Sequence, residues 1–226
     1  MSVEFDVISI GALAQNRLWG EASAVRTSHA TTTLVRTGDR LILVDPSLPS
    51  PALEARFFER TGMSLTKVTD VFCTTLRPTH RRNAQALPSA KWWAAEAEID
   101  AACQALEEFL GSAQRLGTDD VQAAKADLKI VQRFKPAPDK FGPQVSLYPL
   151  IGPSAGSSGL LLTPATTTVI IAGDAALTAG HVLAGQIWEG CGDRQKALES
   201  LEDLLQIADI IVPGHDNVMF CPQRVV

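Results

Sequence analysis

The sequence lacks any apolar run that approaches the roughly 20 residues needed for a membrane-spanning helix. Its N-terminal segment, MSVEFDVISIGALAQ, carries acidic side chains where a secretory signal peptide needs positive charge. We therefore expect a cytoplasmic protein without a membrane partner.

Cysteine is scarce, and no two cysteines are close together in the sequence. Cys73, Cys103, Cys191 and Cys221 are widely separated, and no CxxC pair is present. This spacing fits neither a disulfide framework nor a zinc knuckle. We expect all four side chains to be reduced thiols.

A concentration of positive charge is also missing. Lysine and arginine are scattered along the chain, and the formal net charge is −5. A protein that binds nucleic acid normally gathers basic side chains into a patch or stripe that faces the phosphates. We therefore expect no nucleic-acid partner.

No linker or low-complexity segment divides the 226 residues. Hydrophobic residues make up 46% of the chain and charged residues 20%, which is ordinary for a folded protein and unlike a disordered one. Chains of this length often form one layered domain. We expect a single domain that spans residues 1–226.

Two hairpins are predicted, and each delivers an aspartate. The first lies in residues 31–44 and ends at Asp45, and the second lies in residues 159–172 and ends at Asp174. The similar spacing in the two halves suggests a duplicated layout.

The remaining pattern predicts helices and single strands around these hairpins. Pro78 favours a loop after a strand, Gly117 a helix stop, and Asp193 a helix N-cap. The predicted elements are a helix at 51–60, a strand at 68–72, a loop at 73–80, a strand at 91–95, helices at 100–116 and 194–208, and a strand at 209–212. Hairpins and helices in both halves favour two sheets between helix layers over an alternating doubly wound sheet.

Three apolar strands end in polar residues, and together they carry a family resemblance. They are LILVD at residues 41–45, IIAGD at 170–174 and IIVPGH at 210–215. In this order and at these intervals they resemble the strand-end motifs of metallo-β-lactamase-fold hydrolases, over about residues 30–216. The resemblance implies an α/β (α+β) fold, built as a four-layer αββα sandwich.

That family carries an HxHxDH loop, which falls here on residues 75–80, Thr-Leu-Arg-Pro-Thr-His. By the resemblance, the ligands of the first metal correspond to Thr75, Arg77 and Pro153. None of these residues is a histidine. The resemblance thus implies that the first metal position is lost, and with it the usual two-zinc hydrolysis.

The ligands of the second metal correspond to Thr79, His80, Asp174 and His215. Three of the four, His80, Asp174 and His215, keep a side chain that can bind a metal. Two imidazoles and one carboxylate form a known set for a single zinc or non-haem iron ion. The resemblance therefore implies either no metal cofactor or a single zinc or iron ion.

Arg77 brings a permanent positive charge to the vacated first position. Two roles stay open at this point. Arg77 could pair with Asp174 and disfavour a cation, or it could hold an anionic ligand beside a single metal. Asp174 and Arg77 are the candidate catalytic residues.

Other residues that could carry chemistry have simpler interpretations. We expect Asp45 to hold the loop around residues 75–80 by hydrogen bonds, and to be no ligand. His29 and His181 match no ligand position of the family, and we expect surface or capping roles for both. We expect Trp92, Trp93 and Trp188 to pack in the core or at its rim, and we note Trp188 because its segment follows the Asp174 loop.

Three functions remain open. The first is a hydrolase homologue whose degenerate metal site is catalytically inactive and which serves as a scaffold for a small-molecule or anionic ligand, or for a partner. The alternative is a mononuclear enzyme that uses His80, Asp174 and His215, with metal-bound water attacking an ester, thioester, amide or phosphoester. The third is a subunit of a symmetric homodimer.

Overall fold

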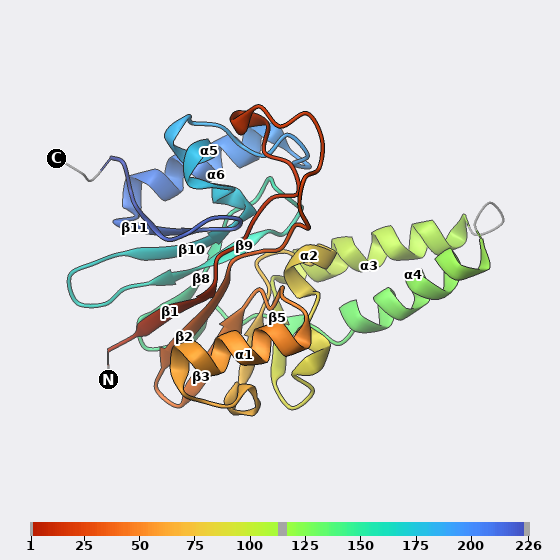
Figure 1. The fold of residues 1–226 in the computed structure, drawn as a ribbon, viewed down its shortest axis with the longest axis horizontal. Coiled ribbons are helices and arrows are strands. Elements are labelled where there is room, and N and C mark those ends of the chain that lie inside the picture. The colour runs from red at the N-terminus through yellow and green to blue at the C-terminus, as the bar shows by residue number, and fades with distance from the viewer. Residues whose placement is uncertain (1, 113–116, 224–226) are drawn as a thin grey trace.

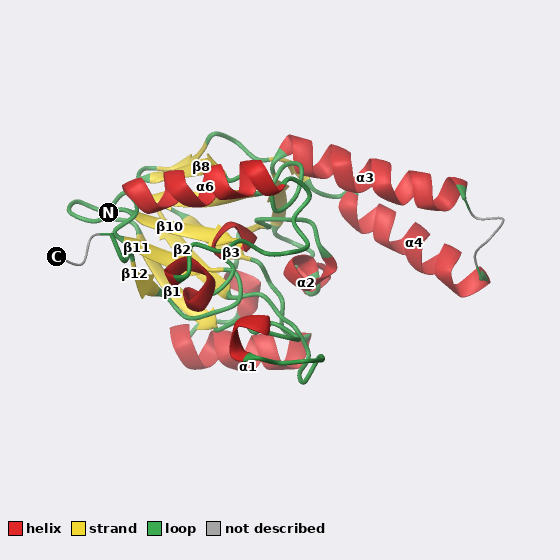
Figure 2. Cartoon of the chain, turned by 90° about the horizontal axis from the view of Figure 1, so that it is seen from above, coloured by secondary structure: helices red, strands yellow, loops and turns green. Residues whose placement is uncertain are grey.

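The structure is a computed structural model that describes residues 2–112 and 117–223. Within these residues, two β-sheets lie face to face and helices cover their outer sides (Figures 1 and 2). Helix α1 (Ser50–Thr61) packs on one sheet, and helices α5 (Ala179–Leu183) and α6 (Arg194–Ile207) pack on the other. The predicted four-layer αββα sandwich is confirmed.

The first sheet has the strand order β1-β2-β3-β4-β5-β6. Strands β1, β2 and β3 pair antiparallel, whereas β3, β4, β5 and β6 pair parallel. The strands are β1 (Glu4–Ser9), β2 (Thr32–Thr37), β3 (Arg40–Val44), β4 (Asp70–Phe72), β5 (Lys91–Ala94) and β6 (Lys135–Pro136).

The second sheet has the order β12-β11-β10-β9-β8-β7. Only β10 and β11 pair parallel, and the other neighbours within this described sheet are antiparallel. The strands are β7 (Lys140–Gly142), β8 (Val145–Pro149), β9 (Ser158–Leu162), β10 (Val169–Gly173), β11 (Ile210–Pro213) and β12 (Met219–Phe220). In each sheet a hairpin is followed by helix and then a parallel strand, so the duplicated layout extends beyond the hairpins.

Side chains alternate between the two faces of the first sheet, as the pleat of a strand requires. Leu34 and Leu43 pack toward α1, whereas Val35, Ile42 and Val44 pack against the second sheet. All five side chains are fully buried. The apolar alternation of the sequence is therefore what holds the αββα layers together.

Two predicted element boundaries were wrong. The loop predicted for residues 73–80 ends in a short helix, α2 (Pro78–Arg81), because Pro78 stands in its first turn, where no N–H partner is lost. The helix predicted for residues 100–116 is α3 (Glu96–Gly111), and residues 113–116 lie outside the described residues. Gly117, the predicted stop, is instead the N-cap of α4 (Thr118–Val131).

Helices α3 and α4 form a hairpin that extends away from the sheets (Figures 1 and 2). Its base is tied to α2, because Arg81 makes a bidentate ion pair with Asp127 of α4. Short 3₁₀ turns complete the described helices: η1 (Arg17–Trp19), η2 (Leu65–Lys67), η3 (Ala84–Ala86) and η5 (Asp174–Ala176). Among all these helices, none is long and apolar enough to cross a membrane.

Candidate metal centre

Three side chains from separate parts of the chain converge at one edge of the sheets. His80 comes from α2, Asp174 from the end of β10, and His215 from the turn after β11. The Nε2 atom of His80 lies 3.1 Å from Asp174 Oδ1, and the Nε2 atom of His215 lies 3.2 Å from the same oxygen. All three side chains are buried. The structure thus brings the three predicted ligands together.

Glycine lets the end of β10 approach both the end of β11 and the loop after β4. A Cβ atom on Gly173 would lie 2.3 Å from Thr74 Oγ1, and a Cβ atom on Gly214 would lie 2.7 Å from the Gly173 carbonyl carbon. Gly173 also has a φ of 54°, which a side chain would strain. Because β10 and β11 are parallel, Asp174 and His215 then emerge side by side at the same end of the sheet.

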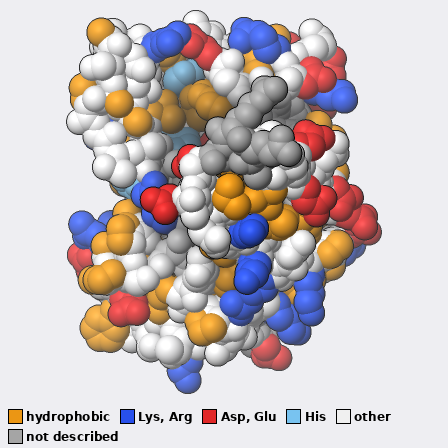
Figure 3. All heavy atoms as spheres, turned by 90° about the vertical axis from the view of Figure 1, so that its right-hand side faces the viewer, with side chains coloured by type: hydrophobic (Ala, Val, Ile, Leu, Met, Phe, Trp, Pro, Cys, Tyr) orange, Lys and Arg blue, Asp and Glu red, His pale blue; other side chains and the backbone are white. Residues whose placement is uncertain are grey.

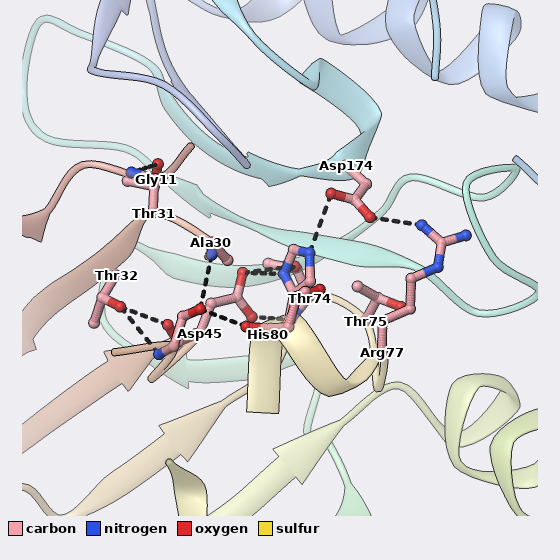
Figure 4. A network of polar contacts seen from close by, with 12 residues as sticks. Gly11, Ala30, Thr31, Thr32, Asp45, Thr74, Thr75, Arg77, His80 and Asp174 are labelled. Carbon is pink, nitrogen blue, oxygen red and sulfur yellow. Dashed lines mark hydrogen bonds and ion pairs between the residues drawn. The ribbon is translucent and has the colours of Figure 1, made fainter. Parts of the chain in front are cut away.

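Each histidine is oriented by a hydrogen bond to its other ring nitrogen. His80 Nδ1 lies 3.0 Å from Asp45 Oδ2, and His215 Nδ1 lies 2.9 Å from the carbonyl oxygen of His29. Asp45 also accepts hydrogen bonds from the backbone N–H and the hydroxyl of Thr74, so it ties down the following loop as expected. Figure 4 shows the His80 ring between Asp45 and Asp174. Both Nε2 atoms are therefore directed at Asp174.

The charges of the cluster shift two pKa values in opposite directions. Burial lowers the pKa of His80, but the carboxylates of Asp174 and Asp45 outweigh it and raise this pKa to about 10. Burial raises the pKa of Asp174, but His80 and His215 hold this pKa well below its usual value. In the absence of a metal ion, the charges of a protonated His80 and of Arg77 together balance those of the two carboxylates. A cation would have to displace that proton.

Arg77 engages the other oxygen of the same aspartate. Its Nη1 atom lies 2.6 Å from Asp174 Oδ2, and its Nη2 atom donates to the carbonyl oxygen of Pro153. Figure 4 shows Arg77 beside Asp174. The guanidinium also stacks on Trp188, with Arg77 Cζ 4.0 Å from the centroid of the ring. Of the two roles left open for Arg77, the structure contains the ion pair with Asp174.

The remaining positions of the implied first metal offer no ligand. Thr75 turns its hydroxyl away and donates to Glu98 Oε1 at 2.7 Å. Pro153 contributes only a backbone carbonyl, and that oxygen is held by Arg77 and by the N–H of Gly192. No second cluster of side chains therefore faces Asp174 Oδ2 from these positions.

His29 and His181 do not join the cluster. His29 contributes its carbonyl oxygen to His215, and its own Nε2 lies 3.0 Å from the Ile10 carbonyl oxygen. His181 Nδ1 lies 2.7 Å from the hydroxyl of Thr178, which caps α5. Burial lowers the pKa of His181. Both residues have the surface and capping roles expected from the sequence.

Glu98 is a site neighbour that the sequence analysis missed. Its carboxylate accepts hydrogen bonds from Thr75, in the loop that carries Arg77, and from Ser154, in the loop that carries Pro153. An acidic side chain in the first turn of a helix is ordinary, so nothing in the local pattern marked Glu98.

A pocket of about 280 Å³ opens beside the cluster. Arg77, Asp174, His215 and Trp188 form its polar and aromatic wall. The other lining residues are Leu13, Ala14, Gln15, Ser28, Thr79 and Leu177. Figure 3 shows a face on which histidine side chains are visible within a hollow bordered by apolar side chains. A small molecule can therefore reach the ion pair and His215.

The donor set fits one cation. Two ligands about 2.0–2.1 Å from a tetrahedral zinc ion lie about 3.3 Å apart, which is close to the observed Nε2–Oδ1 separations of 3.1 and 3.2 Å. The ligand atoms of all three residues lie within 4.8 Å of one another. Among the described residues, this is the one group of three or more His, Cys, Asp or Glu side chains placed closely enough to hold a metal ion. The second oxygen of the aspartate, Asp174 Oδ2, pairs with Arg77.

Comparisons with solved structures agree with this fold. A metallo-beta-lactamase from Thermotoga maritima has a TM-score of 0.71 and 17% identity, covering 97% of this chain and 100% of its own. AidC, a dizinc quorum-quenching lactonase, has a TM-score of 0.67 and 19% identity, covering 84% and 74%. A mutant of AiiA from B. thuringiensis, with N-decanoyl-L-homoserine bound at the active site, has a TM-score of 0.63 and 17% identity, covering 96% and 94%.

No curated protein is similar enough in sequence to count as a match. The family model described as the metallo-beta-lactamase superfamily, however, matches residues 25–215, which is most of the chain. With its αββα fold and its strand-end cluster, this chain belongs to the metallo-β-lactamase superfamily.

Proposed function

We propose that the chain is a metallo-β-lactamase-fold hydrolase homologue with a degenerate metal site. In this proposal Arg77 takes the place of one of two cations, and the His80, Asp174 and His215 cluster holds one zinc or iron ion at most. The ion pair of Arg77 Nη1 with Asp174 Oδ2, at 2.6 Å, carries the proposal. The chain would then lack two-zinc hydrolysis and act as a scaffold for a small ligand.

Electrostatics support the exclusion of a second ion. Two unit charges 4 Å apart repel by about 4 kcal/mol at an effective dielectric constant of about 20, and a divalent ion doubles this energy. A metal ion bound at Asp174 Oδ2 would be repelled by the guanidinium of Arg77 unless it displaced that group. Displacing Arg77 would also break its contacts with Pro153 and Trp188.

The ligand that fits best is a small anion. The contacts of Arg77 within the described residues use two of its five N–H donors, so donors remain for a carboxylate or a phosphate. The pocket of about 280 Å³ lies at the small end of ligand-binding cavities. Its apolar walls, including Leu13 and Leu177, would cover the rest of the molecule.

A second candidate function is that of a mononuclear hydrolase of esters, thioesters, amides or phosphoesters. The observation that favours it is the pair of hydrogen bonds that fixes His80 Nδ1 and His215 Nδ1 and leaves both Nε2 atoms directed inward. Partners of this kind commonly orient metal-binding histidines. Because AidC is described as a lactonase and AiiA with a bound N-acyl homoserine, a lactone is a reasonable test ester.

In that candidate enzyme, each of the described site residues would have its own role. When bound, a zinc or iron ion would supply Lewis acidity and lower the pKa of water. His80, Asp174 and His215 would hold it, with Asp45 and the His29 carbonyl keeping the rings in place. Arg77 would donate to an oxygen of the substrate that gains negative charge. Its stacking on Trp188 holds that donor group still.

Metal analysis and an activity panel separate the two candidates. The untagged protein is purified, its metal is measured by mass spectrometry, and an ester, a lactone, a thioester, an amide and a phosphodiester are tested with and without chelator. The inactive scaffold predicts no chelator-sensitive turnover on any of these substrates. Turnover that chelator abolishes and that His215→Ala removes would favour the mononuclear hydrolase instead.

A further inference from the structure

A buried carboxylate outside the cluster, that of Glu98, contacts the loop that carries Arg77. Glu98 stands in the first turn of α3 and is 4% exposed. A carboxylate withdrawn from water is stable only when its oxygens accept hydrogen bonds. The partners of Glu98 therefore show what holds it in place.

Glu98 accepts four hydrogen bonds, and each oxygen serves one loop. Oε1 accepts from the Thr75 hydroxyl at 2.7 Å and from the Leu76 N–H at 2.8 Å. Oε2 accepts from the Ser154 hydroxyl at 2.7 Å and from the Gly156 N–H at 3.1 Å. The first pair belongs to the loop after β4, residues 73–77, and the second to the loop between β8 and β9, residues 150–157.

The second loop is shaped to reach this carboxylate. A Cβ atom on Gly156 would lie 2.1 Å from the backbone nitrogen of Glu98, so the loop backbone lies directly on the start of α3 and needs glycine there. The hydroxyls of Thr75 and Ser154 are also 3.3 Å apart. The two loops thus meet at Glu98 in a close and fully hydrogen-bonded contact.

These are the two loops that set the position of the guanidinium. Arg77 belongs to the first loop, and Pro153, whose carbonyl accepts from Arg77 Nη2, belongs to the second. A relative shift of the loops would therefore move Nη1 away from Asp174 Oδ2 or break the bond to Pro153. Hydrogen bonds to a charged acceptor are stronger and shorter than bonds between neutral groups. The carboxylate of Glu98 therefore resists a movement of one loop relative to the other.

We propose that Glu98 is a positioning residue: its carboxylate cross-links loops 73–77 and 150–157 without a metal ion and so holds Arg77 against Asp174. We refer to this set of four hydrogen bonds as the Glu98 cross-link. The role goes beyond the proposed function and does not depend on whether the cluster binds a cation.

Amide hydrogen exchange of the chelator-treated protein tests the proposal. The Leu76 and Gly156 amides each donate to Glu98, so they report on the cross-link directly. We expect both to be protected in the wild type without metal. In Glu98→Gln one side-chain oxygen becomes an N–H₂ donor, and we expect at least one of the two amides to exchange about tenfold faster or more. Glu96→Gln removes an exposed charge from the same helix turn and should leave both amides unchanged.

A spectroscopic readout follows the guanidinium itself. Tryptophan emission should change in Glu98→Gln, because Trp188 stacks on Arg77. The change should be absent when Trp188→Phe is the background. A merely stabilising role would leave emission of the folded variant as it was, and that result would overturn the positioning role.

A second variant and a zinc titration complete the test of the Glu98 proposal. If Glu98→Gln fails to fold, Ser154→Ala removes one bond of the cross-link and should raise exchange at Gly156 while β10 stays protected. If the wild-type Leu76 and Gly156 amides are protected only after zinc is added, the proposal is wrong. Finding two zinc ions per chain would overturn the proposed function. The Glu98 proposal would still hold in that case, provided that the Leu76 and Gly156 amides are protected from exchange in chelator.

Discussion

Arg77 and Asp174 form a short ion pair in which Nη1 of the guanidinium lies 2.6 Å from Oδ2 of the carboxylate. The other oxygen of Asp174 faces His80 and His215. One carboxylate is thus divided between a permanent cation and a pair of imidazoles. This division is the physical basis for expecting one metal position where two would otherwise share the aspartate.

Removing the guanidinium should strengthen binding of a single cation. Arg77→Ala takes away a positive charge that competes for Asp174, and we expect its affinity for zinc to rise about tenfold or more, which corresponds to about 1.4 kcal/mol. A competition titration against a zinc-binding dye measures this. Arg82→Ala is the matched control, since Arg82 is exposed and donates to the Ser28 carbonyl, outside the cluster. Equal zinc affinity in Arg77→Ala and the wild type would contradict the account.

Loss of the Asp45 carboxylate should have the opposite effect. Asp45→Asn weakens the partner that orients His80 Nδ1, and such changes typically lower metal affinity by about 10- to 100-fold. The same dye titration applies, with Asp39→Asn in the exposed β2–β3 turn as the control. An unchanged affinity would mean that His80 is not a ligand or is oriented by other contacts.

The stability of the metal-free protein should depend on pH through His80. Its pKa is raised from 6.5 to about 10 in the folded state, so its contribution is fully present below pH 6.5 and is lost as the pH rises toward 10. The pKa of Asp174 is lowered from 3.8, so its contribution is present above pH 3.8 and is lost as the pH falls further.

Denaturant titrations in chelator at pH 6, 8 and 10 measure the His80 contribution. The free energy of unfolding should fall across this series in the wild type, and His80→Gln should show a flatter dependence. Parallel curves for the two proteins would show that His80 is not protonated in the folded state.

The fold of the Trp188 loop gives a further prediction. A Cβ atom on Gly190 would lie 2.5 Å from the Trp188 ring, so Gly190→Ala requires a shift of the indole or of the loop, and we expect the indole to move relative to Arg77. We expect altered tryptophan emission and a destabilisation of about 0.5–1 kcal/mol from the lost cation–π contact. Gly192→Ala is the control, because its nearest atom would be 3.8 Å away. Identical emission spectra of the two variants would contradict the stacking.

Much of the fold followed from local patterns in the sequence. The apolar runs before Asp45 and Asp174 predicted both hairpins, and the family resemblance implied that His80, Asp174 and His215 lie near one another. Asp174 and His215 meet because β10 and β11 are parallel and end at the same edge of one sheet, whereas His80 reaches them from the loop region after β4 of the other sheet. The αββα order needed the family resemblance as well, since pairing of distant strands is not visible in any short window.

Other features depended on contacts that no local pattern carries. Helix α4 was not predicted, because its segment is rich in alanine and charged residues and presents only a weak apolar face. The Glu98 cross-link joins residues far apart in the sequence through hydrogen bonds rather than through a motif. The cytoplasmic location and the homodimer remain predictions that a single chain does not test.

The central claim is that Arg77 occupies one of the two cation positions beside Asp174 and leaves the other free for a metal ion. Crystals grown with zinc, and measured at the zinc absorption edge, test this most directly by anomalous scattering. The account predicts at most one peak in the site, among His80, Asp174 and His215, with the Arg77 guanidinium still in hydrogen-bond contact with Asp174. Two peaks bridged by Asp174, with Arg77 turned away, would contradict it.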